Sequence, residues 1–325
     1  MANICRRLVR TVGCAALSLY VAQAAAEWHP TRVVRLIVPY PPGNIADVQG
    51  RLVGERLSVK LGQPVVIDNR PGATGQIGIE AAARSAPDGH TLVVGQTGTF
   101  AVAPQTRKLS YDVIEDFVPV AQFSSNSLVL FVNAGVGVSS LPELIRVSRI
   151  KPGALRFGSN GEGGLPHLAM ELLKIKTGID WLHVPYKGTS QLEADLVAGH
   201  IDVGFGSYGG LLPQVEAGRL RMLASTGAKR SIEAPDLPTF IEGGVPDFEV
   251  AGWFGAFAPA KTPREAIEAL NAAINSVLQE PQLQQKIRQA GAKPEPGSPD
   301  QFGAVFLSSY SLWRDVVKSI GLPMQ

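Results

Sequence analysis

Apolar residues along the chain follow two spacings, one typical of buried strands and the other of amphipathic helices. The run 33–38 is apolar over the length of a strand and is ended by Pro39. After a loop rich in proline and glycine, apolar positions recur every three or four residues over 45–61, which predicts a helix that Gly62 ends. A second apolar run follows at 65–67. The segment therefore predicts a right-handed βαβ unit.

The same alternation continues through the middle of the chain. Short buried strands that alternate with helices favour parallel α/β sheets. Ser140 and Glu143 have the spacing of a capping box, which would open one of the helices. The predicted helices are 76–86, 141–150, 165–176, 191–198 and 211–217, and the predicted strands are 91–94, 155–158, 182–184, 201–205 and 220–224.

The C-terminal part departs from this alternation. An aromatic, strand-like run at 252–258 is followed by three helical segments, 263–279, 281–290 and 299–319. Because these helices have one strand of their own, we expect them to pack on the sheet formed by the beginning of the chain. A chain of 325 residues is also longer than one core usually needs. We therefore expect a discontinuous first lobe, 27–127 plus 252–325, and a second lobe, 128–251, which is the arrangement of a hinged binding protein.

The N-terminal residues have the pattern of an export signal. Three arginines (Arg6, Arg7 and Arg10) precede an apolar run at 12–22, and small residues follow up to Ala26. The apolar run is shorter than the roughly 20 residues of a membrane-spanning helix. We expect residues 1–26 to be a signal peptide cleaved near Ala26, after Ala26 or Ala24, and the mature protein to be soluble and periplasmic.

Removal of this leader changes the composition of the protein. Both cysteines, Cys5 and Cys14, lie in it, so the mature chain would have no disulfide and no thiol ligand. The formal net charge moves from +2 to −1. A near-neutral chain without basic runs indicates neither nucleic-acid binding nor a membrane-surface patch.

Loops rich in Gly, Ser, Thr, Asn or Pro follow six of the predicted strands. In open parallel sheets, ligands bind at the carboxyl ends of the strands. Backbone N–H groups at helix N-termini can bind carboxylate or phosphate there without a cationic side chain. Asn44 fits an N-cap, with Asp47 in the same turn. The six loops are 40–44, 70–75, 95–99, 159–164, 186–190 and 206–210.

Motifs for other chemistries are weak or absent from the sequence. There is no phosphate-binding G-x-x-x-x-G-K-[ST] loop, and the G-x-G-x-x-G match at 204–209 has no acid after the next strand. Ser159, Ser207 and His167 are the candidates for hydrolysis, but no G-x-S-x-G motif surrounds either serine. The histidines lack the H-E-x-x-H spacing of a zinc site. We expect no catalytic set, no metal and no cofactor.

Several runs, in order along the chain, resemble the receptors of tripartite tricarboxylate transporters (TctC), also called Bug proteins. The first ligand loop of that family resembles PYPPGNIAD at 39–47, and its second signature is similar to DNRPGATGQIG at 68–78 followed by APDGHTL at 86–92. Further similarity lies in GSNGEG at 158–163 with His167-Leu168, HVPYKG at 183–188, AGHIDV at 198–203, PDLPTF at 235–240, and Trp253.

The resemblance implies a two-lobed periplasmic binding protein of the type II, Venus-flytrap class, in which each lobe is a sheet flanked by helices. It implies a monomer that binds a small carboxylate in its cleft and is recognised by membrane transporter subunits. Asp47 would hold the loop, the helix start or a water molecule and would not touch the carboxylate directly. The ligand residues implied by position are Tyr40, Gly43, Asn44, Ile45, Ala46, Asp47, Thr97 and Thr99 in the first lobe and Ser159, Asn160, Gly161, Gly163, His167, Tyr186 and Ser207 in the second.

Three positions depart from the family pattern and bear on the ligand. Asn44 stands where a glycine is usual, Gly164 where a hydroxyl residue is usual, and Gly206 where the residue is often polar or acidic. The function predicted from the sequence is capture of a di- or tricarboxylate, an amino acid or an aromatic acid for transport. A sensory receptor for the same solute and an exported hydrolase or lyase are the alternatives.

Overall fold

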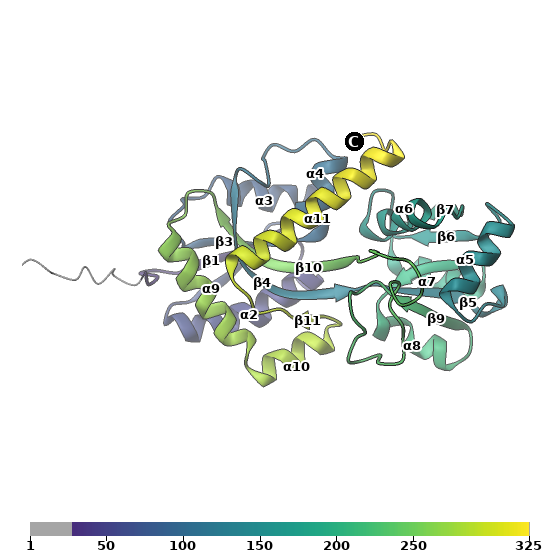
Figure 1. Cartoon of the computed structure of the whole chain (residues 1–325). Helices are drawn as coiled ribbons and strands as arrows, with labels where there is room; N and C mark the ends of the chain where they lie inside the picture. The colour runs from purple at the N-terminus through teal and green to yellow at the C-terminus, as the bar shows by residue number, and fades with distance from the viewer. Residues whose placement is uncertain (1–27, 325) are drawn as a thin grey trace, which may run out of the picture.

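Two α/β lobes lie side by side in the molecule and are joined by strands that run from one lobe to the other (Figure 1). The computed structural model describes residues 28–324, so the predicted leader and its cleavage near Ala26 lie outside the described residues. Within 28–324, none of the helices combines the length and the apolar character needed to cross a bilayer.

The first lobe contains a six-stranded mixed sheet. Its β1 strand pairs in parallel with β2 on one side and β3 on the other, as expected for the βαβ start of the chain. Strand β10 runs antiparallel between β3 and β4, and the short β11 closes the far edge. The order is β11 (Lys293–Pro294), β4 (Phe117–Ser127), β10 (Ala251–Pro259), β3 (Thr91–Gln96), β1 (Val34–Val38) and β2 (Val65–Asn69).

The second lobe contains a five-stranded mixed sheet. Strand β6 pairs in parallel with β7 and β8, whereas β5 runs antiparallel to β8 and β9. The order is β7 (Leu182–Pro185), β6 (Arg156–Ser159), β8 (Val203–Gly206), β5 (Val129–Asn133) and β9 (Leu220–Ser225).

Parallel pairing, as expected from the alternation of strands and helices, is present among the βαβ strands, but both sheets also contain antiparallel strands. The strands that run against the βαβ strands are β10 and β11 in the first sheet and β5 in the second. Strand β4 ends at Ser127 and β5 begins at Val129, so the chain enters the second sheet almost without a break. Strand β4 runs in the same direction as the βαβ strands of the first lobe, and β5, which continues it, enters the second sheet antiparallel to β8. The sequence pattern at 117–133 had not indicated these two strands.

Helices cover both faces of each sheet, as expected for the α/β class. On one face of the first sheet, α2, α9 and α10 bury a continuous core against β1, β3 and β4. On its other face, α3, the helical segment 98–106 and α11 share one core with α5 and α6 of the second lobe. The second sheet is closed on its other face by α7 and α8. The helices are α2 (Ile45–Leu61), α3 (Gln76–Ala83), α4 (Ala103–Thr106), α5 (Leu141–Ile150), α6 (Leu165–Thr177), α7 (Thr189–Ala198), α8 (Tyr208–Glu216), α9 (Arg264–Leu278), α10 (Pro281–Gln289) and α11 (Pro299–Ile320), with single turns η1 (Ala73–Gly75), η2 (Gly98–Val102) and η3 (Ala134–Val136).

The C-terminal helix α11 is fixed to the first lobe by aromatic side chains. Trp253 of β10 packs edge-on against Phe302 of α11, with ring centroids 5.3 Å apart. Gly255 of β10 admits this helix, because a side chain at that position would collide with the Phe302 ring. Helix α11 also contacts α6, and its end reaches toward the second lobe (Figure 1). Helices α9 and α10 pack on one face of the first sheet and α11 on the other.

Two of the predicted helix caps are present and one is half formed. The Asn44 side chain accepts a hydrogen bond from the Ala46 N–H at 2.9 Å, and Gly62 ends α2 in the left-handed conformation at φ 65°. Ser140 Oγ accepts from the Glu143 N–H at 3.3 Å, but the Glu143 carboxylate accepts from the Ser139 N–H, not from Ser140. The capping box is therefore shifted by one residue at its acidic end.

Candidate functional site

A cavity of about 260 Å³ lies between the lobes and joins four of the six predicted loops to the helical segment that follows one of them. It is smaller than the roughly 300–1,000 Å³ pockets that hold drug-sized ligands, so it suits a small solute. We call it the cleft cavity. Its wall from the first lobe is formed by Tyr40, Thr74, Gly98, Thr99, Val102, Ala103, Thr106 and Arg107, and its wall from the second lobe by residues 160–165.

Tyr40 presents a phenol to this cavity. It follows β1, is half-buried, and its hydroxyl accepts a hydrogen bond from Gln96 Nε2 at 2.5 Å. Burial raises the pKa of Tyr40, against the opposing influence of the Gln96 hydrogen bond and the Arg107 charge, so the phenol keeps its proton. A hydroxyl that accepts from an amide can still donate its own proton. Tyr40 can therefore donate a hydrogen bond to an oxygen of a bound solute.

The rest of the first loop is organised around the Asp47 carboxylate. Asp47 is 2% exposed and accepts from the Gly43 N–H at 2.9 Å, from Arg51 Nε at 2.9 Å and from Asn69 Nδ2 at 2.8 Å. Burial alone raises the pKa of Asp47, but the hydrogen bonds from Arg51, Gly43 and Asn69 lower it by more, so its pKa lies below the usual value. The carboxylate thus ties the loop to the start of α2 and to the end of β2.

Several predicted ligand residues of the first lobe do not line the cleft cavity. Gly43, Asn44 and Ile45 are at the surface or half-exposed beside it, while Ala46 and Asp47 are buried. Their contact with a ligand stays a prediction.

The two threonines of the third loop have different surroundings. Thr99 lines the cavity and its hydroxyl donates to the Gln96 carbonyl oxygen at 3.2 Å. Thr97 is 2% exposed, and its hydroxyl accepts from the Trp253 N–H of β10 at 2.9 Å. Thr97 therefore joins the third loop to the returning strand, and Thr99 is the member of the pair that faces the cavity.

The second wall is made largely of backbone at the start of α6. Asn160, Gly161 and Gly163 line it together with Gly164, the N-cap residue of α6, which has no side-chain capping hydrogen bond. Free N–H groups and the positive end of the helix dipole favour an anion at such a position. The absence of a hydroxyl at Gly164 leaves this helix end open toward the cavity.

Buried polar side chains hold that glycine loop from below. Ser159 is fully buried and lies within hydrogen-bond distance of the Gly161 carbonyl oxygen at 3.0 Å and of His183 Nε2 at 2.7 Å. The Gly163 N–H donates to His167 Nδ1 at 3.0 Å, so this ring nitrogen is unprotonated. The two imidazoles stack with centroids 4.1 Å apart. Ser159 and His167 therefore support the loop and do not line the cavity.

Burial keeps both imidazoles neutral. It is the largest influence on each, and it lowers the pKa of His167 despite the nearby Glu171 and Glu162 carboxylates. The pKa of His183 is lowered to about 4 by burial and by the charges of His167 and Lys174. Ser159 is fully buried and its contacts serve the loop, so it is not an exposed nucleophile for the hydrolase alternative.

The remaining predicted residues, Tyr186 and Ser207, lie outside the cavity lining. The Tyr186 hydroxyl donates to Asp195 Oδ2 at 2.7 Å, and burial together with this hydrogen bond raises the pKa of Tyr186 to about 12. Ser207 is exposed at the start of α8 and makes no side-chain cap. Their role as ligand contacts also stays a prediction.

Sequence reasoning did not select Thr74, Thr106, Arg107 and Glu162, which also line the cavity. Arg107 and Thr106 were missed because the helical segment 98–106 was not predicted, and this segment carries them back to the third loop. The available signal was a polar pair, Thr106 and Arg107, about two helical turns beyond the loop. Thr74 and Glu162 lay within selected loops and were passed over.

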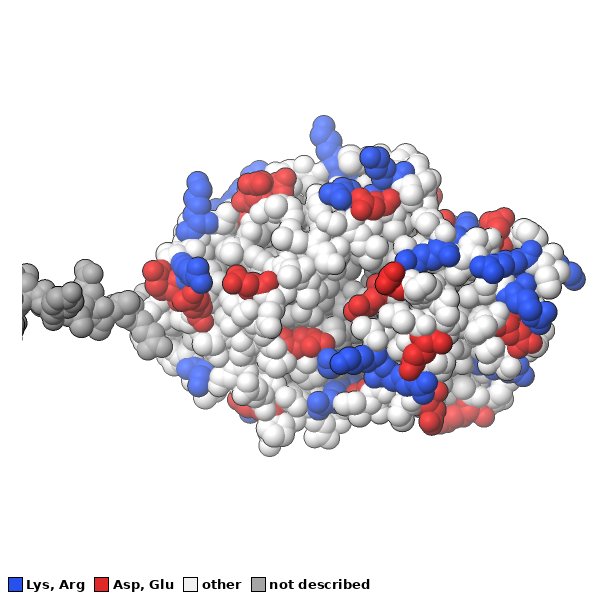
Figure 2. Space-filling view, in the orientation of Figure 1, with Lys and Arg blue, Asp and Glu red and all other residues white. Residues whose placement is uncertain are grey.

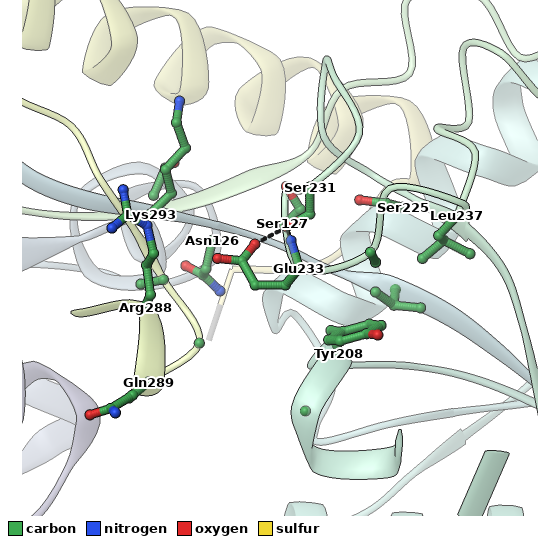
Figure 3. Close-up of a pocket in the computed structure, with 16 residues that line it drawn as sticks. Asn126, Ser127, Tyr208, Ser225, Ser231, Glu233, Leu237, Arg288, Gln289 and Lys293 are labelled. Carbon is green, nitrogen blue, oxygen red and sulfur yellow. Dashed lines mark hydrogen bonds between the residues drawn. The ribbon is translucent and has the colours of Figure 1, made fainter. Parts of the chain in front are cut away.

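A second cavity, of about 220 Å³, lies on the hinge strands (Figure 3). Asn126 and Ser127 at the end of β4 form its floor, and Tyr208 of α8 contributes from the second lobe. Figure 3 shows Glu233 beside Ser231, whose hydroxyl donates to it, and Arg288 and Lys293 on the other side. One of the six predicted loops reaches this cavity, so we regard the cleft cavity as the candidate site.

Neither the charges on the face shown in Figure 2 nor the metal-ligating side chains within residues 28–324 give a competing site. Lysines and arginines are interspersed with acids over the face shown in Figure 2, without a patch of one sign. Within residues 28–324, no group of three or more His, Cys, Asp or Glu side chains is arranged to hold a metal ion.

Comparison with known proteins relates the whole chain to transport receptors. Residues 50–322 match the family described as the tripartite tricarboxylate transporter family receptor, TctC. The protein BugT of Bordetella pertussis is 35% identical over 310 residues, which cover 94% of each chain. A protein encoded in the tcbD-tcbE intergenic region of Pseudomonas sp. strain P51 is 35% identical over 321 residues, 98% of this chain and 95% of that one.

Solved structures agree in fold and sequence. A structure described as a periplasmic transporter is 36% identical, with a TM-score of 0.74, and covers 92% of this chain and 100% of that one. A protein from R. palustris solved with adipate is 35% identical, with a TM-score of 0.74 and coverage of 91% and 99%. MatC from the same species, solved with bound malate, is 31% identical, with a TM-score of 0.70 and coverage of 89% and 99%.

The match over residues 50–322, the identity along nearly the whole chain and the two-lobed fold agree with one another. They describe a binding protein of a transport system and not an enzyme. The chain belongs to the tripartite tricarboxylate transporter receptor family of periplasmic solute-binding proteins.

Proposed function

We propose that this protein is exported to the periplasm, binds a small carboxylate in the cleft cavity and delivers it to the membrane subunits of a tripartite tricarboxylate-type transporter. The observation that carries the proposal is the composition of that cavity. A protonated phenol, Tyr40, faces the open N-terminus of α6 across it, and both can donate hydrogen bonds to an oxygen anion. The relatives solved with adipate and with malate support a carboxylate ligand.

The division into lobes gives this site its mechanism. We place residues 27–127 plus 252–325 in the first lobe and 128–251 in the second, supported by the membership of the two sheets. The solute would settle on one wall, and closure would bring the other wall across it. Closure is favoured only if the ligand contacts the closed state better than the open one. The leader at 1–26 supports export of the mature chain.

Thermal-shift screening tests carboxylate capture directly. Mono-, di- and tricarboxylates, sugars and neutral amides would be added to the purified protein at matched ionic strength. A ligand at a hundred times its Kd stabilises the native state by about 2.7 kcal/mol, which raises the melting temperature by several degrees. The proposal is wrong if sugars or amides raise it and no carboxylate does.

A matched pair of variants ties binding to the cleft cavity. Tyr40→Phe removes the phenol proton and is expected to weaken carboxylate binding roughly 3- to 10-fold. Tyr310→Phe makes the same change on α11, away from this cavity, and is expected to leave binding unchanged.

Uptake of the bound carboxylate by cells with and without the gene tests the transport role.

A further inference from the structure

Arg107 places a positively charged side chain in the wall of the cleft cavity. It follows α4 directly, and its side chain is half-buried. One N–H group, on Nη1, donates to Thr74 Oγ1 at 2.9 Å. Within residues 28–324 no carboxylate forms an ion pair with this guanidinium. A guanidinium has five N–H donors, and Thr74 is the acceptor of one of them, so the others remain available to a ligand.

The residue that orients Arg107 has an unusual backbone. Ala73 and Thr74 have φ values of 46° and 56°, in the left-handed region, and neither is a glycine. This conformation is unfavourable for residues with a side chain, and such strain is concentrated at ligand clamps and active sites. Here it brings the Thr74 hydroxyl to the Arg107 guanidinium at the edge of the cavity. The hydrogen bond fixes the direction of the guanidinium before a ligand arrives.

Arg107 is separate from the groups assigned to the first carboxylate. Tyr40 and the start of α6 donate neutral hydrogen bonds, whereas Arg107 offers a full charge and a planar pair of donors that fits a carboxylate in bidentate geometry. Glu162 lines the opposite wall, is exposed, and makes no ion pair with Arg107 here. The walls of the cavity therefore contain neutral hydrogen-bond donors and one cationic donor.

We propose that Arg107, oriented by Thr74, binds a second carboxylate of the ligand and is the residue that makes the site select dicarboxylates over monocarboxylates of the same length. The inference rests on the proposed function, since it concerns the same cavity. It adds a charge-selecting residue outside the loops that carry the family resemblance.

Calorimetric titration with charge-matched probes tests the selection. Succinate, glutarate and adipate would each be compared with the monoamide of the same diacid, which has the same length and one carboxylate fewer. The wild-type protein is expected to bind the diacid that fits it best roughly 10- to 100-fold more tightly than the monoamide. Arg107→Gln is expected to remove that preference and to change monoamide binding by less than about 3-fold.

Further variants separate local from general effects. Lys108→Gln removes a charge from the neighbouring exposed residue and should keep the full preference. Thr74→Val keeps the branched side chain without the hydroxyl and should reduce the preference in part. It also provides a test if Arg107→Gln does not fold, as judged by circular dichroism. Arg107→Lys should restore part of the preference, because it keeps the charge and loses the planar fork.

The outcomes distinguish this inference from the proposed function. If no carboxylate and no monoamide binds, the proposed function itself fails. If carboxylates bind but the preference is absent from the wild type or survives in Arg107→Gln, the inference fails and the proposed function stands. Equal loss of diacid and monoamide binding in Arg107→Gln and in Glu162→Gln would show that these residues pair with each other on closure, which also overturns it.

Discussion

The two walls of the cleft cavity are built in different ways. The first lobe presents side chains, Tyr40 and Arg107, each held by another side chain, Gln96 and Thr74. The second lobe presents the backbone of a glycine loop, which is held from below by the imidazoles of His167 and, through Ser159, His183. The first wall can therefore distinguish ligands by charge, while the second supplies N–H groups that any carboxylate can use. Five changes test whether the walls are independent.

The largest effect is expected for Asp47→Ala in the first wall. It leaves the Gly43 N–H without its acceptor, removes one of the two acceptors of Asn69 Nδ2 and removes the ion-pair partner of Arg51. We expect the free energy of unfolding to fall by about 2–3 kcal/mol, because hydrogen bonds to a buried charge are lost. The ion pair with Arg51 adds little to this value, because the Arg51 side chain is half exposed to solvent. Urea unfolding measures it. A loss below about 0.5 kcal/mol would contradict the role assigned to Asp47.

A steric change at α3 tests the packing behind the first wall. A Cβ at Gly78 would lie 2.8 Å from the Arg70 carbonyl oxygen and 2.8 Å from Pro39 Cα, which are backbone atoms and cannot move aside cheaply. Gly78→Ala is expected to cost about 1–3 kcal/mol and to displace the Tyr40 loop, so carboxylate binding weakens as well. Gly303→Ala in α11 is the control, because its Cβ would meet Pro119 Cγ at an ordinary 3.6 Å. Unchanged binding in Gly78→Ala would separate α3 from the site.

Acid should weaken the second wall before the first. In the unfolded chain histidine titrates near pH 6.5, whereas the pKa of His183 in the folded protein is about 4. The unfolded state therefore takes up more protons between these values, and stability falls as the pH is lowered from about 6.5 to about 4. We expect a loss of about 1–2 kcal/mol, given the partial exposure of the ring.

The contribution of the first wall to stability is lost at a lower pH than that of the second wall. The pKa of Asp47 is below its ordinary value, so its contribution is present above about pH 4 and is lost as the pH falls further. Unfolding measured from pH 7 to pH 3 should show both ranges. His183→Gln should flatten the upper range and leave the lower one. If it alters neither, the imidazole pair is not the cause.

Removal of one acceptor tests how the glycine loop is held. His167→Phe keeps an aromatic ring against His183 but leaves the Gly163 N–H without an acceptor. We expect a loss of about 1–2 kcal/mol in stability and weaker binding of mono- and dicarboxylates alike. His167→Asn supplies an acceptor of similar reach and should recover part of both. A selective loss of dicarboxylate binding would mean that the walls are not independent.

The smallest effect is expected at the start of α6. Gly164 has φ −77° and ψ 163°, which a serine can adopt, and a Cβ there would meet its nearest neighbour, the Gly161 carbonyl oxygen, at 3.4 Å. Gly164→Ser supplies the missing cap and should raise stability by up to about 1 kcal/mol. Because its hydroxyl would occupy an N–H group of the second wall, carboxylate binding should weaken a few-fold. Tighter binding would indicate that a hydroxyl here contacts the ligand directly.

The sequence predicted the elements of the fold well because most of them are defined locally. Both ends of helix α2 could be predicted, because Asn44 caps its start and Gly62 ends it. Each of these residues forms its hydrogen bond with a residue only two or three positions away in the sequence. Strand β4 could not be found, because its polar end, Ser124 to Ser127, pairs with β10 and β11 from more than a hundred residues later. The register of β4 is decided by these distant partners, so the local sequence shows no alternation of apolar and polar residues that would predict the strand.

The site divides in the same way. Tyr40, Thr99, Asn160, Gly161 and Gly163 were selected from loop chemistry or family resemblance, and they do line the cleft cavity. His167 and Ser159 were selected with them, yet they face inward and support the loop. The direction in which a side chain points depends on packing against β7 and α6, which loop composition does not contain.

By itself the sequence determined that the chain is an α/β protein of two lobes, that glycine-rich loops follow its strands, and that it resembles a family of transport receptors. These properties follow from short-range patterns of apolar residues, caps and turns. Only the tertiary structure decided that the sheets are mixed and which loops meet at the cleft cavity. It also decided that Arg107 and Thr74 line this cavity together with those loops. Those features depend on contacts between residues far apart in the chain, whose energies appear only when the lobes are assembled.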